Sequence, residues 1–489
     1  MSHKLIQNAQ IGCEKSLSSE KHILLVLSED TQNDVPFLQT VTSKLARSHG
    51  EWEDLQKTPL QIELANGGMA SVVVLKADLS MFEKHALLRK AVMPLLAEQP
   101  AAIALCVYGD ATTREAHACA SYYVTSVNAA ALPNRKKDKK IKPLELVSLF
   151  GYAAPHDYGD VNARVAGNTL CRSLTLLPPN ALTPALYREQ LQALAMVHGW
   201  QHTEWDMAAL KAMGAGAFVA VAQGSEPQDA AIVRLTYQPK DAQKYVALVG
   251  KGICFDTGGH NLKPAKYMQG MHADMNGSAV ALGIMLAATQ QQLNIQIDCW
   301  LAIAQNHIGP LAYKQNDVVT ALNGMTIEVV HTDAEGRMVL ADTLTLASRP
   351  NQDGKCPDFI MDFATLTGSM QTALGDRMSG VIANRPELAC KAVGAGAKAG
   401  ERVVAFPYDA DYDSDLDSEV ADIMQCTIDS DADHLLAARF LGKFIDQDIA
   451  WLHVDLSAYK RKDGLGAVQS DVNGFGVGFG LEMLRALMA

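Results

Sequence analysis

Short apolar runs rich in β-branched residues recur along this chain, and helix-length segments separate them. This alternation is typical of an α/β protein, in which helices cover a sheet that is at least partly parallel. In the second half of the chain the strand-like runs are "KYVALVG" (244–250), "QIDCWLAIA" (296–304), "MTIEVV" (325–330), "DFIMDFATL" (358–366) and "IAWLHVDL" (449–456). The sequence therefore predicts an α/β fold built on a mixed sheet flanked by helices.

The chain has 489 residues, which is comfortable for two domains. Residues 1–155 alternate strand-like runs with a helix-like segment at 81–99, and the strand-like runs lie at 21–30, 69–80 and 101–110. The pattern restarts near residue 160 with two helix-length segments, of which the second opens with the good cap and first-turn pair Thr183-Pro184. We therefore expect a smaller N-terminal α/β domain over 1–155 and a larger C-terminal α/β domain over 156–489.

Charge and composition narrow the class of partners. The formal net charge of −12 argues against general affinity for nucleic acids and for anionic membrane surfaces. The basic run "NRKKDKKIKP" (134–143) is the exception, and we interpret it as a solvated loop rather than a nucleic-acid contact. The sequence holds no run of roughly 20 apolar residues and no apolar stretch near its start, so we expect neither a membrane span nor a signal peptide. Nine scattered cysteines without a CxxC pair suit free thiols in a reducing cytoplasm.

Charged residues follow the strand-like runs, where ligands bind in open α/β sheets. After the run at 244–250 come Lys251, Asp256 and Lys263, and Asp274 precedes a small apolar helix-like segment. The stretch "VVHTDAEGRMVLAD" (329–342) adds Asp333, Glu335 and Arg337. Each residue also has a structural interpretation, because Asp274 could cap its helix, Thr332 and Glu335 fit a capping box, and Lys251 could be a surface lysine at a strand end.

Taken together, the four carboxylates favour a site over four separate structural roles. Two carboxylates about 4 Å apart repel each other by roughly 4 kcal/mol at an effective dielectric near 20. A cluster therefore needs protonation, bases or metal ions, and two divalent cations would supply the matching charge. Carboxylate-rich sites suit Mn²⁺ and Mg²⁺, and Zn²⁺ also fits. Such a pair of ions favours hydrolysis by an activated water, with Lys263 and Arg337 holding anionic groups.

Other catalytic motifs are absent or weak. The sequence has no HExxH and no GxSxG, and "GAGAFVA" (214–220) lacks the third glycine of a dinucleotide loop. None of the cysteines has a neighbouring histidine, and the histidines show no metal-ligand spacing. His331, which adjoins Thr332 and Asp333, is the histidine to follow, and we interpret it as a residue that supports the site.

The segments "VGKGICFDTGG", "MHADMNGSA", "HTDAEGRMVLAD" and "DFATLTGSM" resemble the cytosol (leucyl) aminopeptidase family. The resemblance runs through about residues 160–480, is densest over 245–375, and gives the N-terminal part only the general character of the family's variable α/β domain. It implies a two-metal aminopeptidase that acts on short peptides with a free N-terminus. It also implies a homohexamer in the cytoplasm.

Carried over by position, the resemblance assigns a role to each candidate. The implied ligands of two divalent ions are Lys251, Asp256, Asp274, Asp333 and Glu335, with Asp256 and Glu335 bridging the ions. Lys251 would coordinate only as a neutral amine, so its pKa would have to be depressed by the cations. Lys263 resembles the lysine that stabilises the oxyanion, and Arg337 the arginine that holds a bicarbonate general base. The residues that line the substrate cleft by resemblance are Met271, Thr365, Leu366 and Gly368.

Departures from the family pattern fall around the substrate pocket. His331 replaces an asparagine and His260 stands in the "GGHNLKP" stretch, so two titratable groups lie near the site. Ser457 and Lys460 occupy positions that help to shape the side-chain pocket, which leaves the preferred first residue open. Two alternatives to an ordinary aminopeptidase follow: a hexameric DNA-binding or scaffold protein with secondary peptidase activity, and a dinuclear hydrolase of another amide.

Overall fold

The computed structural model describes residues 3–31, 35–137, 142–155, 157–351, 353–429, 431–445 and 448–488. Residues 138–141 of the basic run lie outside these ranges. The chain forms two compact units: Met1–Thr169 with Ala397–Glu401 and Arg461–Asn473, and Leu170–Gly396 with Arg402–Lys460 and Gly474–Ala489. The first unit thus extends beyond residue 155 and takes back two short segments from the C-terminal part. Among the described residues, no helix combines the length and the apolar character needed to cross a membrane.

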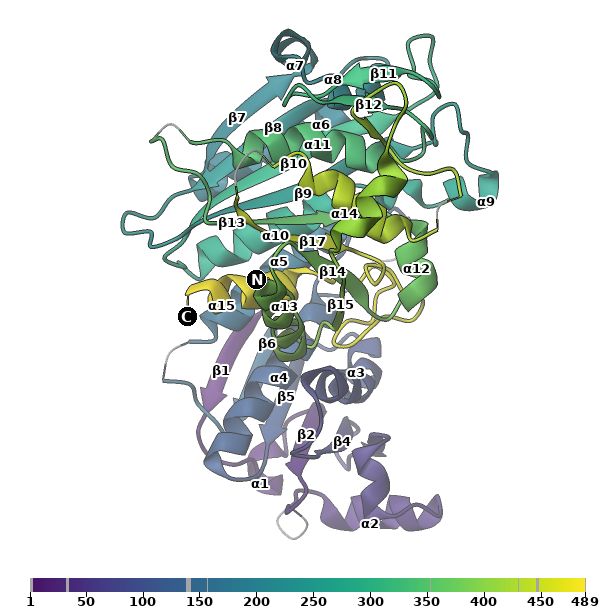
Figure 1. Cartoon of the computed structure of the whole chain (residues 1–489). Helices are drawn as coiled ribbons and strands as arrows, with labels where there is room; N and C mark the ends of the chain where they lie inside the picture. Colours follow the sequence, from purple (N-terminus) through teal and green to yellow (C-terminus); the bar gives the residue numbers. More distant parts are fainter. Residues whose placement is uncertain are drawn as a thin grey trace. The chain divides into compact units, whose positions relative to one another are not determined.

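A six-stranded sheet forms the centre of the first unit (Figure 1), in the order β1-β6-β5-β2-β4-β3. All neighbouring strands are parallel except the edge strand β3, which is antiparallel to β4. The predicted apolar runs become β2, β4 and β5, and their buried side chains fill the core. The strands are β1 (Lys4–Asn8), β2 (His22–Ser28), β3 (Leu60–Glu63), β4 (Met69–Leu75), β5 (Ala102–Val107) and β6 (Leu146–Phe150).

The helices of the first unit begin where the sequence supplies caps. Ser80 accepts a hydrogen bond from the backbone of Glu83 at the start of α3, and Asp110 does the same for Thr113 at the start of α4. Both helices place a buried face against the sheet and against each other. The helices are α1 (Glu14–Leu17), α2 (Leu38–Arg47), α3 (Met81–Ala97), α4 (Ala111–Ala129) and α5 (Gly159–Thr175), which continues into the second unit.

The second unit is built on an eight-stranded mixed sheet in the order β15-β14-β17-β13-β9-β10-β8-β7 (Figure 1). The central strands β17, β13, β9 and β10 are parallel, whereas β14 and β8 pair antiparallel to this group on its two sides. Buried apolar residues on both faces explain why these strands read as continuous apolar runs. The strands are β7 (Gln201–Asp206), β8 (Ala231–Tyr237), β9 (Tyr245–Asp256), β10 (Gln296–Asn306), β13 (Phe359–Ala364), β14 (Ser379–Ala383), β15 (Val403–Phe406) and β17 (Ala450–Asp455).

Two buried helices, α10 (Asn276–Gln290) and α11 (Glu335–Ser348), pack on β9. Gly277 allows the first turn of α10 to approach the sheet, because a Cβ there would collide with the carbonyl oxygen of Phe363 on β13. On its other side α10 packs against α15, while α11 packs against α8 and α14. The first turn of α10 is therefore held at the sheet itself.

One predicted strand lies elsewhere. The run at 325–330 forms β12, which belongs to a separate three-stranded sheet of order β11-β12-β16 rather than to the central sheet. Its strands are β11 (Val318–Thr320), β12 (Thr326–Glu328) and β16 (Ile423–Met424). The other helices of this unit are α6 (Pro184–His198), α7 (Met207–Met213), α8 (Gly216–Ala222), α9 (Ala265–Met268), α12 (Gly368–Leu374), α13 (Pro386–Ala399), α14 (Asp433–Gly442) and α15 (Val477–Met488). As predicted, Thr183 caps α6 by accepting a hydrogen bond from the backbone of Leu186.

Candidate active site

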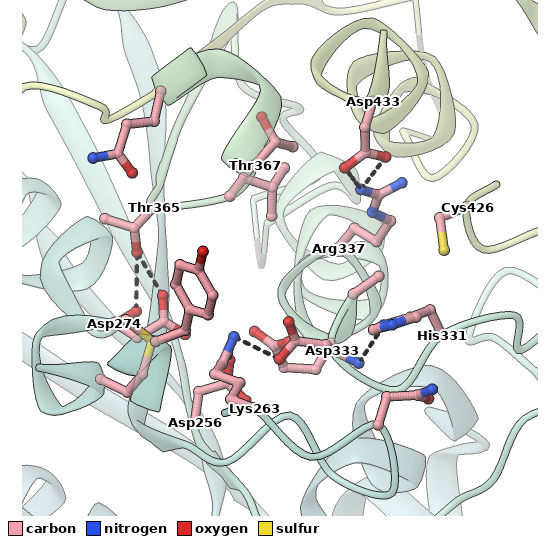
Figure 2. Close-up of a pocket in the computed structure, with 18 of the residues that line it drawn as sticks. Asp256, Lys263, Asp274, His331, Asp333, Arg337, Thr365, Thr367, Cys426 and Asp433 are labelled. Carbon is pink, nitrogen blue, oxygen red and sulfur yellow. Dashed lines mark hydrogen bonds and ion pairs between the residues drawn. The ribbon is translucent and has the colours of Figure 1, made fainter. Parts of the chain in front are cut away.

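A pocket of about 760 Å³ lies within the second unit, where β9, β13 and β17 end and α10 and α11 begin (Figure 2). Lys251 and Asp256 come from β9, Asp274 stands two residues before α10, and Glu335 opens α11. All residues that the sequence singled out as ligands, catalytic groups or substrate contacts line this one pocket: Lys251, Asp256, Lys263, Met271, Asp274, Asp333, Glu335, Arg337, Thr365, Leu366 and Gly368.

Lys251 is the cationic centre of the inner part of the pocket. Its Nζ lies 2.8 Å from Asp274 Oδ2 and 2.8 Å from Glu335 Oε1, and it donates a hydrogen bond to the carbonyl of Thr365 at 3.1 Å. Burial opposes the charge on Lys251, but the carboxylates of Asp274 and Glu335 outweigh burial and raise its pKa. The Lys251 ammonium therefore pairs with the acids around it.

Lys263 plays the same part for the outer carboxylates. Its Nζ lies 2.9 Å from Asp256 Oδ2 and 2.5 Å from Asp333 Oδ1 (Figure 2). The turn after β9 brings it there, because Gly258 and Gly259 adopt positive φ angles of 86° and 64° that favour glycine. The backbone N–H of Lys263 then donates to the carbonyl of Thr257 at 2.9 Å, which closes the loop.

Asp256 is held by neutral donors as well. Its Oδ1 accepts hydrogen bonds from the backbone of Gly258 and from Asn306 Nδ2, both at 2.8 Å. Asn306 also donates to the carbonyl of Thr332 at 3.0 Å, so it ties the end of β9 to the loop that carries Asp333.

The alternative interpretation of Asp274, Thr332 and Glu335 as helix-capping residues is wrong. Neither α10 nor α11 has a side-chain cap, since Met275 and Ala334 occupy the cap positions without a side-chain hydrogen bond. The hydroxyl of Thr332 instead donates to the carbonyl of Gly258 at 2.6 Å. Glu335 and Asp274 turn toward Lys251, so pairing in the pocket decides their orientation rather than helix capping.

The carboxylates crowd closely enough to share a cation. One oxygen from each of Asp256, Asp333 and Glu335 lies within 4.8 Å of the others. Burial and the negative charge of Asp256 raise the pKa of Glu335, and burial raises that of Asp274. Glu335 Oε2 is buried and has no hydrogen-bond partner among the described residues. A buried carboxylate oxygen without a partner, in a set of oxygen donors, fits a divalent metal ion.

Arg337 does not stand free for an external anion. Its Nη2 donates to both carboxylate oxygens of Asp433, at 2.7 and 2.8 Å (Figure 2). Its Nη1 donates to the carbonyl of Gln425 at 3.1 Å. A bicarbonate at Arg337 does not fit this arrangement, because a carboxylate of the chain already lies on the guanidinium. Asp433 was not predicted; an acid that opens an apolar helix, here α14 after "DSDA", was the signal for it.

The substrate side of the pocket contains predicted and unpredicted residues. Thr365 donates to Asp274 Oδ1 at 2.7 Å, and the buried Asp455, which was not predicted, accepts from the backbone of Leu366 at 3.1 Å. Ser457 lines the pocket as expected. The expectation for Lys460 is wrong: it is exposed, and the neighbouring Tyr459 takes the place in the lining.

The two histidines near the motifs differ in position. His331 lines the pocket and its Nδ1 accepts a hydrogen bond from the backbone of Asp333 at 3.2 Å, which supports the loop of that carboxylate. The Nδ1 of His260 lies 2.8 Å from the carbonyl oxygen of Tyr313, and His260 does not line the described pocket.

The fold and the pocket define an α/β protein with a carboxylate-rich candidate metal site at the ends of its central strands. A comparison with known protein families agrees with this site: the family model described as "Cytosol aminopeptidase family, catalytic domain" matches residues 169–480. A probable cytosol aminopeptidase of Parasynechococcus marenigrum (strain WH8102) is 38% identical over 371 residues, which are 75% of this chain and 74% of the relative. The chain belongs to the cytosol aminopeptidase family.

Other comparisons give the extent of the similarity. A probable cytosol aminopeptidase of Rhodopseudomonas palustris (strain BisB5) is 37% identical over 327 residues, 66% of this chain, and the match spans 63% of that relative, a little under two thirds. The bottromycin maturation enzyme BotP in complex with Mn has a TM-score of 0.83 and 28% identity, with 95% of this chain and 99% of that chain covered. A mutant of tomato leucine aminopeptidase has a TM-score of 0.85 and 26% identity, with 99% and 97% covered.

Proposed function

We propose that this protein is a metal-dependent aminopeptidase that removes N-terminal residues from short peptides. The observation that carries the proposal is the buried cluster in which Asp256, Asp333 and Glu335 approach one another within 4.8 Å beside Lys251 and Lys263. Membership of the cytosol aminopeptidase family supports the same reaction class.

The ligands would be the residues that the pocket brings together. Two divalent ions, Mn²⁺ or Zn²⁺ and also Mg²⁺, would be held by Lys251, Asp256, Asp274, Asp333 and Glu335. Bound there, the ions would polarise a peptide carbonyl and lower the pKa of a water. The complex of BotP with Mn supports manganese as a ligand of this fold.

The chain's own residues would bind and orient the peptide. The carboxylates of the pocket attract an amino terminus, which favours substrates with a free α-amine. Lys263, with its side chain 14% exposed at the pocket, is placed to stabilise the oxyanion that develops on the scissile carbonyl. Met271, Thr365, Leu366 and Gly368 line the pocket and would contact the first residue of the substrate.

Release of p-nitroaniline from aminoacyl-p-nitroanilides tests the proposal. The protein is stripped with a chelator, and Mn²⁺, Zn²⁺ or Mg²⁺ is added back. We expect metal-restored release from substrates with a free amine and none from the N-acetylated forms of the same substrates. Release from the blocked forms, or the absence of release with every metal while metal binding persists, would contradict aminopeptidase function.

Assembly and location are proposals on the same basis. We propose a homohexamer in the cytoplasm, supported by the family resemblance and by the cytosol aminopeptidase names of the relatives. Light scattering coupled to gel filtration measures the mass of the assembly directly, and a monomer at assay concentration would contradict the hexamer.

A further inference from the structure

Arg337 and Asp433 form an ion pair within the pocket, on helices that are distant in the sequence. Arg337 lies in the first turn of α11 and its side chain is 2% exposed, whereas Asp433 is the first residue of α14 and its side chain is 15% exposed. Both residues line the pocket (Figure 2). The carboxylate accepts two hydrogen bonds from Nη2 of Arg337, at 2.7 and 2.8 Å.

Gln425 fixes the orientation of this guanidinium. Its carbonyl accepts from Arg337 Nη1 at 3.1 Å, and its side-chain amide donates to the carbonyl of Ala334 at 3.0 Å. The side-chain oxygen of Gln425 also accepts from the backbone of His331 at 3.1 Å. Asp433 and Gln425 therefore both bind the guanidinium, and Gln425 is itself hydrogen-bonded to the loop that precedes α11.

The Nε–H group is the hydrogen-bond donor of Arg337 to consider next. Nε is buried and has no hydrogen-bond partner among the described residues. A neutral acceptor such as a water or a peptide carbonyl suits this N–H. A second anion does not, because it would lie beside the carboxylate of Asp433 on a cation whose charge is already paired.

We propose that Asp433 is the anion of this site, supplied by the chain, so that the protein works without a bicarbonate bound at Arg337. The carboxylate of Asp433 is then part of the chain, whereas a diffusible anion would have to be bound from solution. The ion pair fixes the position of Arg337 and compensates its positive charge beside the carboxylate cluster. The activity measurements below rest on the proposed aminopeptidase function; the binding measurement does not.

The first test uses the metal-loaded wild-type enzyme in buffer purged of carbon dioxide. We expect the aminopeptidase rate to be unchanged when millimolar sodium bicarbonate is added. Stimulation by bicarbonate would overturn the proposal, and no variant is needed to see it.

The second test removes the carboxylate of Asp433 from Arg337. Asp433→Ala should lower kcat about 10²-fold, the effect of losing one electrostatic contact in an active site. Added bicarbonate, formate or acetate should recover most of this loss, because the freed guanidinium can then bind a small anion. Asp433→Asn keeps the shape of the side chain, fills the space and should show the loss of rate without the rescue.

Asp431→Ala, which removes an exposed neighbouring acid, is the matched control and should behave as wild type. A full rate in Asp433→Ala, or a loss that no small anion repairs, would overturn the assignment.

The third test reads binding alone. Carbon-13 NMR of labelled bicarbonate with metal-loaded protein should show no bound or exchange-broadened signal for wild type and clear broadening for Asp433→Ala. Adding Arg337→Met to that variant should abolish the broadening. Binding to wild type that Arg337→Met removes would contradict the proposal even if the protein proved to have no peptidase activity.

Discussion

The Nζ of Lys251 lies 2.8 Å from Oε1 of Glu335, and both side chains are almost completely buried. Each charge of this ion pair compensates the other, so neither is buried alone. A lysine can bind a metal ion only as the neutral amine, so the same residue cannot serve as an ammonium and as a ligand. If Lys251 is a metal ligand, as proposed, metal binding replaces its positive charge by that of the ion.

This exchange predicts proton release on metal binding. Neighbouring carboxylates raise the pKa of Lys251, so it is protonated at neutral pH before the metal arrives. We expect wild type to release protons when Mn²⁺ binds, and Lys251→Met to release about one proton fewer. Because protons compete with the metal, apparent affinity should fall as the pH falls. Calorimetry in two buffers of different ionisation enthalpy measures the number released, and an equal number for both proteins would rule out Lys251 as a ligand.

Glu335→Ala removes the carboxylate that has one oxygen on Lys251 and another without a partner. If Glu335 bridges two ions, the variant should bind less metal and lose aminopeptidase activity. Metal content after gel filtration, measured by mass spectrometry, checks the first effect, and Asp353→Ala in an exposed loop is the control. Wild-type turnover with full metal occupancy in Glu335→Ala would show that the ligand set is misassigned.

Lys263→Ala should lower turnover without lowering metal binding. The lysine contacts Asp256 and Asp333, and bound metal ions would replace it as their counter-charge. We expect metal content to stay near wild type and kcat to fall by about 10²–10³, as for a lost oxyanion donor. Lys266→Ala changes an exposed lysine nearby and should leave both quantities unchanged. Loss of metal in Lys263→Ala would assign this residue to the metal site instead.

Sequence reasoning found the sheet and most of the pocket because both depend on local patterns. Apolar runs mark the central strands, and acids that directly follow them converge in an α/β fold. The end of β9 was less predictable: the apolar run stops at Gly250, whereas the strand continues to Asp256 and places Lys251 inside it. The edge strand β7, with little burial, left no apolar run to find, and the edge strand β15 is an apolar run of only four residues, VVAF.

The acid at the start of α14 can be seen in the sequence, but its pairing with Arg337 could not be read from local pattern. Asp433 lies 96 residues further along the chain, and only the packing of α14 against α11 brings the two side chains together. Lys460 shows the opposite error, since its position was taken from a family pattern. The chain there turns Tyr459 inward and leaves the lysine exposed, as the cost of burying an unpaired ammonium requires.

A buried histidine in the first unit gives a test of stability that is independent of the pocket. His85 lies on α3, is 3% exposed, and its ring centroid is 5.4 Å from that of Tyr123. Burial, aided by the positive charge of Arg164, lowers the pKa of His85 from 6.5 to about 3. The unfolded chain binds this proton more readily than the folded one. The contribution of His85 to stability is therefore fully present above pH 6.5 and is lost as the pH falls toward 3.

Between pH 6.5 and about 3, we expect the free energy of unfolding to fall by about 1.4 kcal/mol per pH unit through His85 alone. His85→Gln removes the titrating group, so its urea midpoint should depend less steeply on pH between 7 and about 5, whatever its stability at pH 7. His307→Gln, which replaces an exposed histidine, is the control and should keep the wild-type slope. Equal slopes for wild type and His85→Gln would show that the buried imidazole takes up a proton without opening the fold.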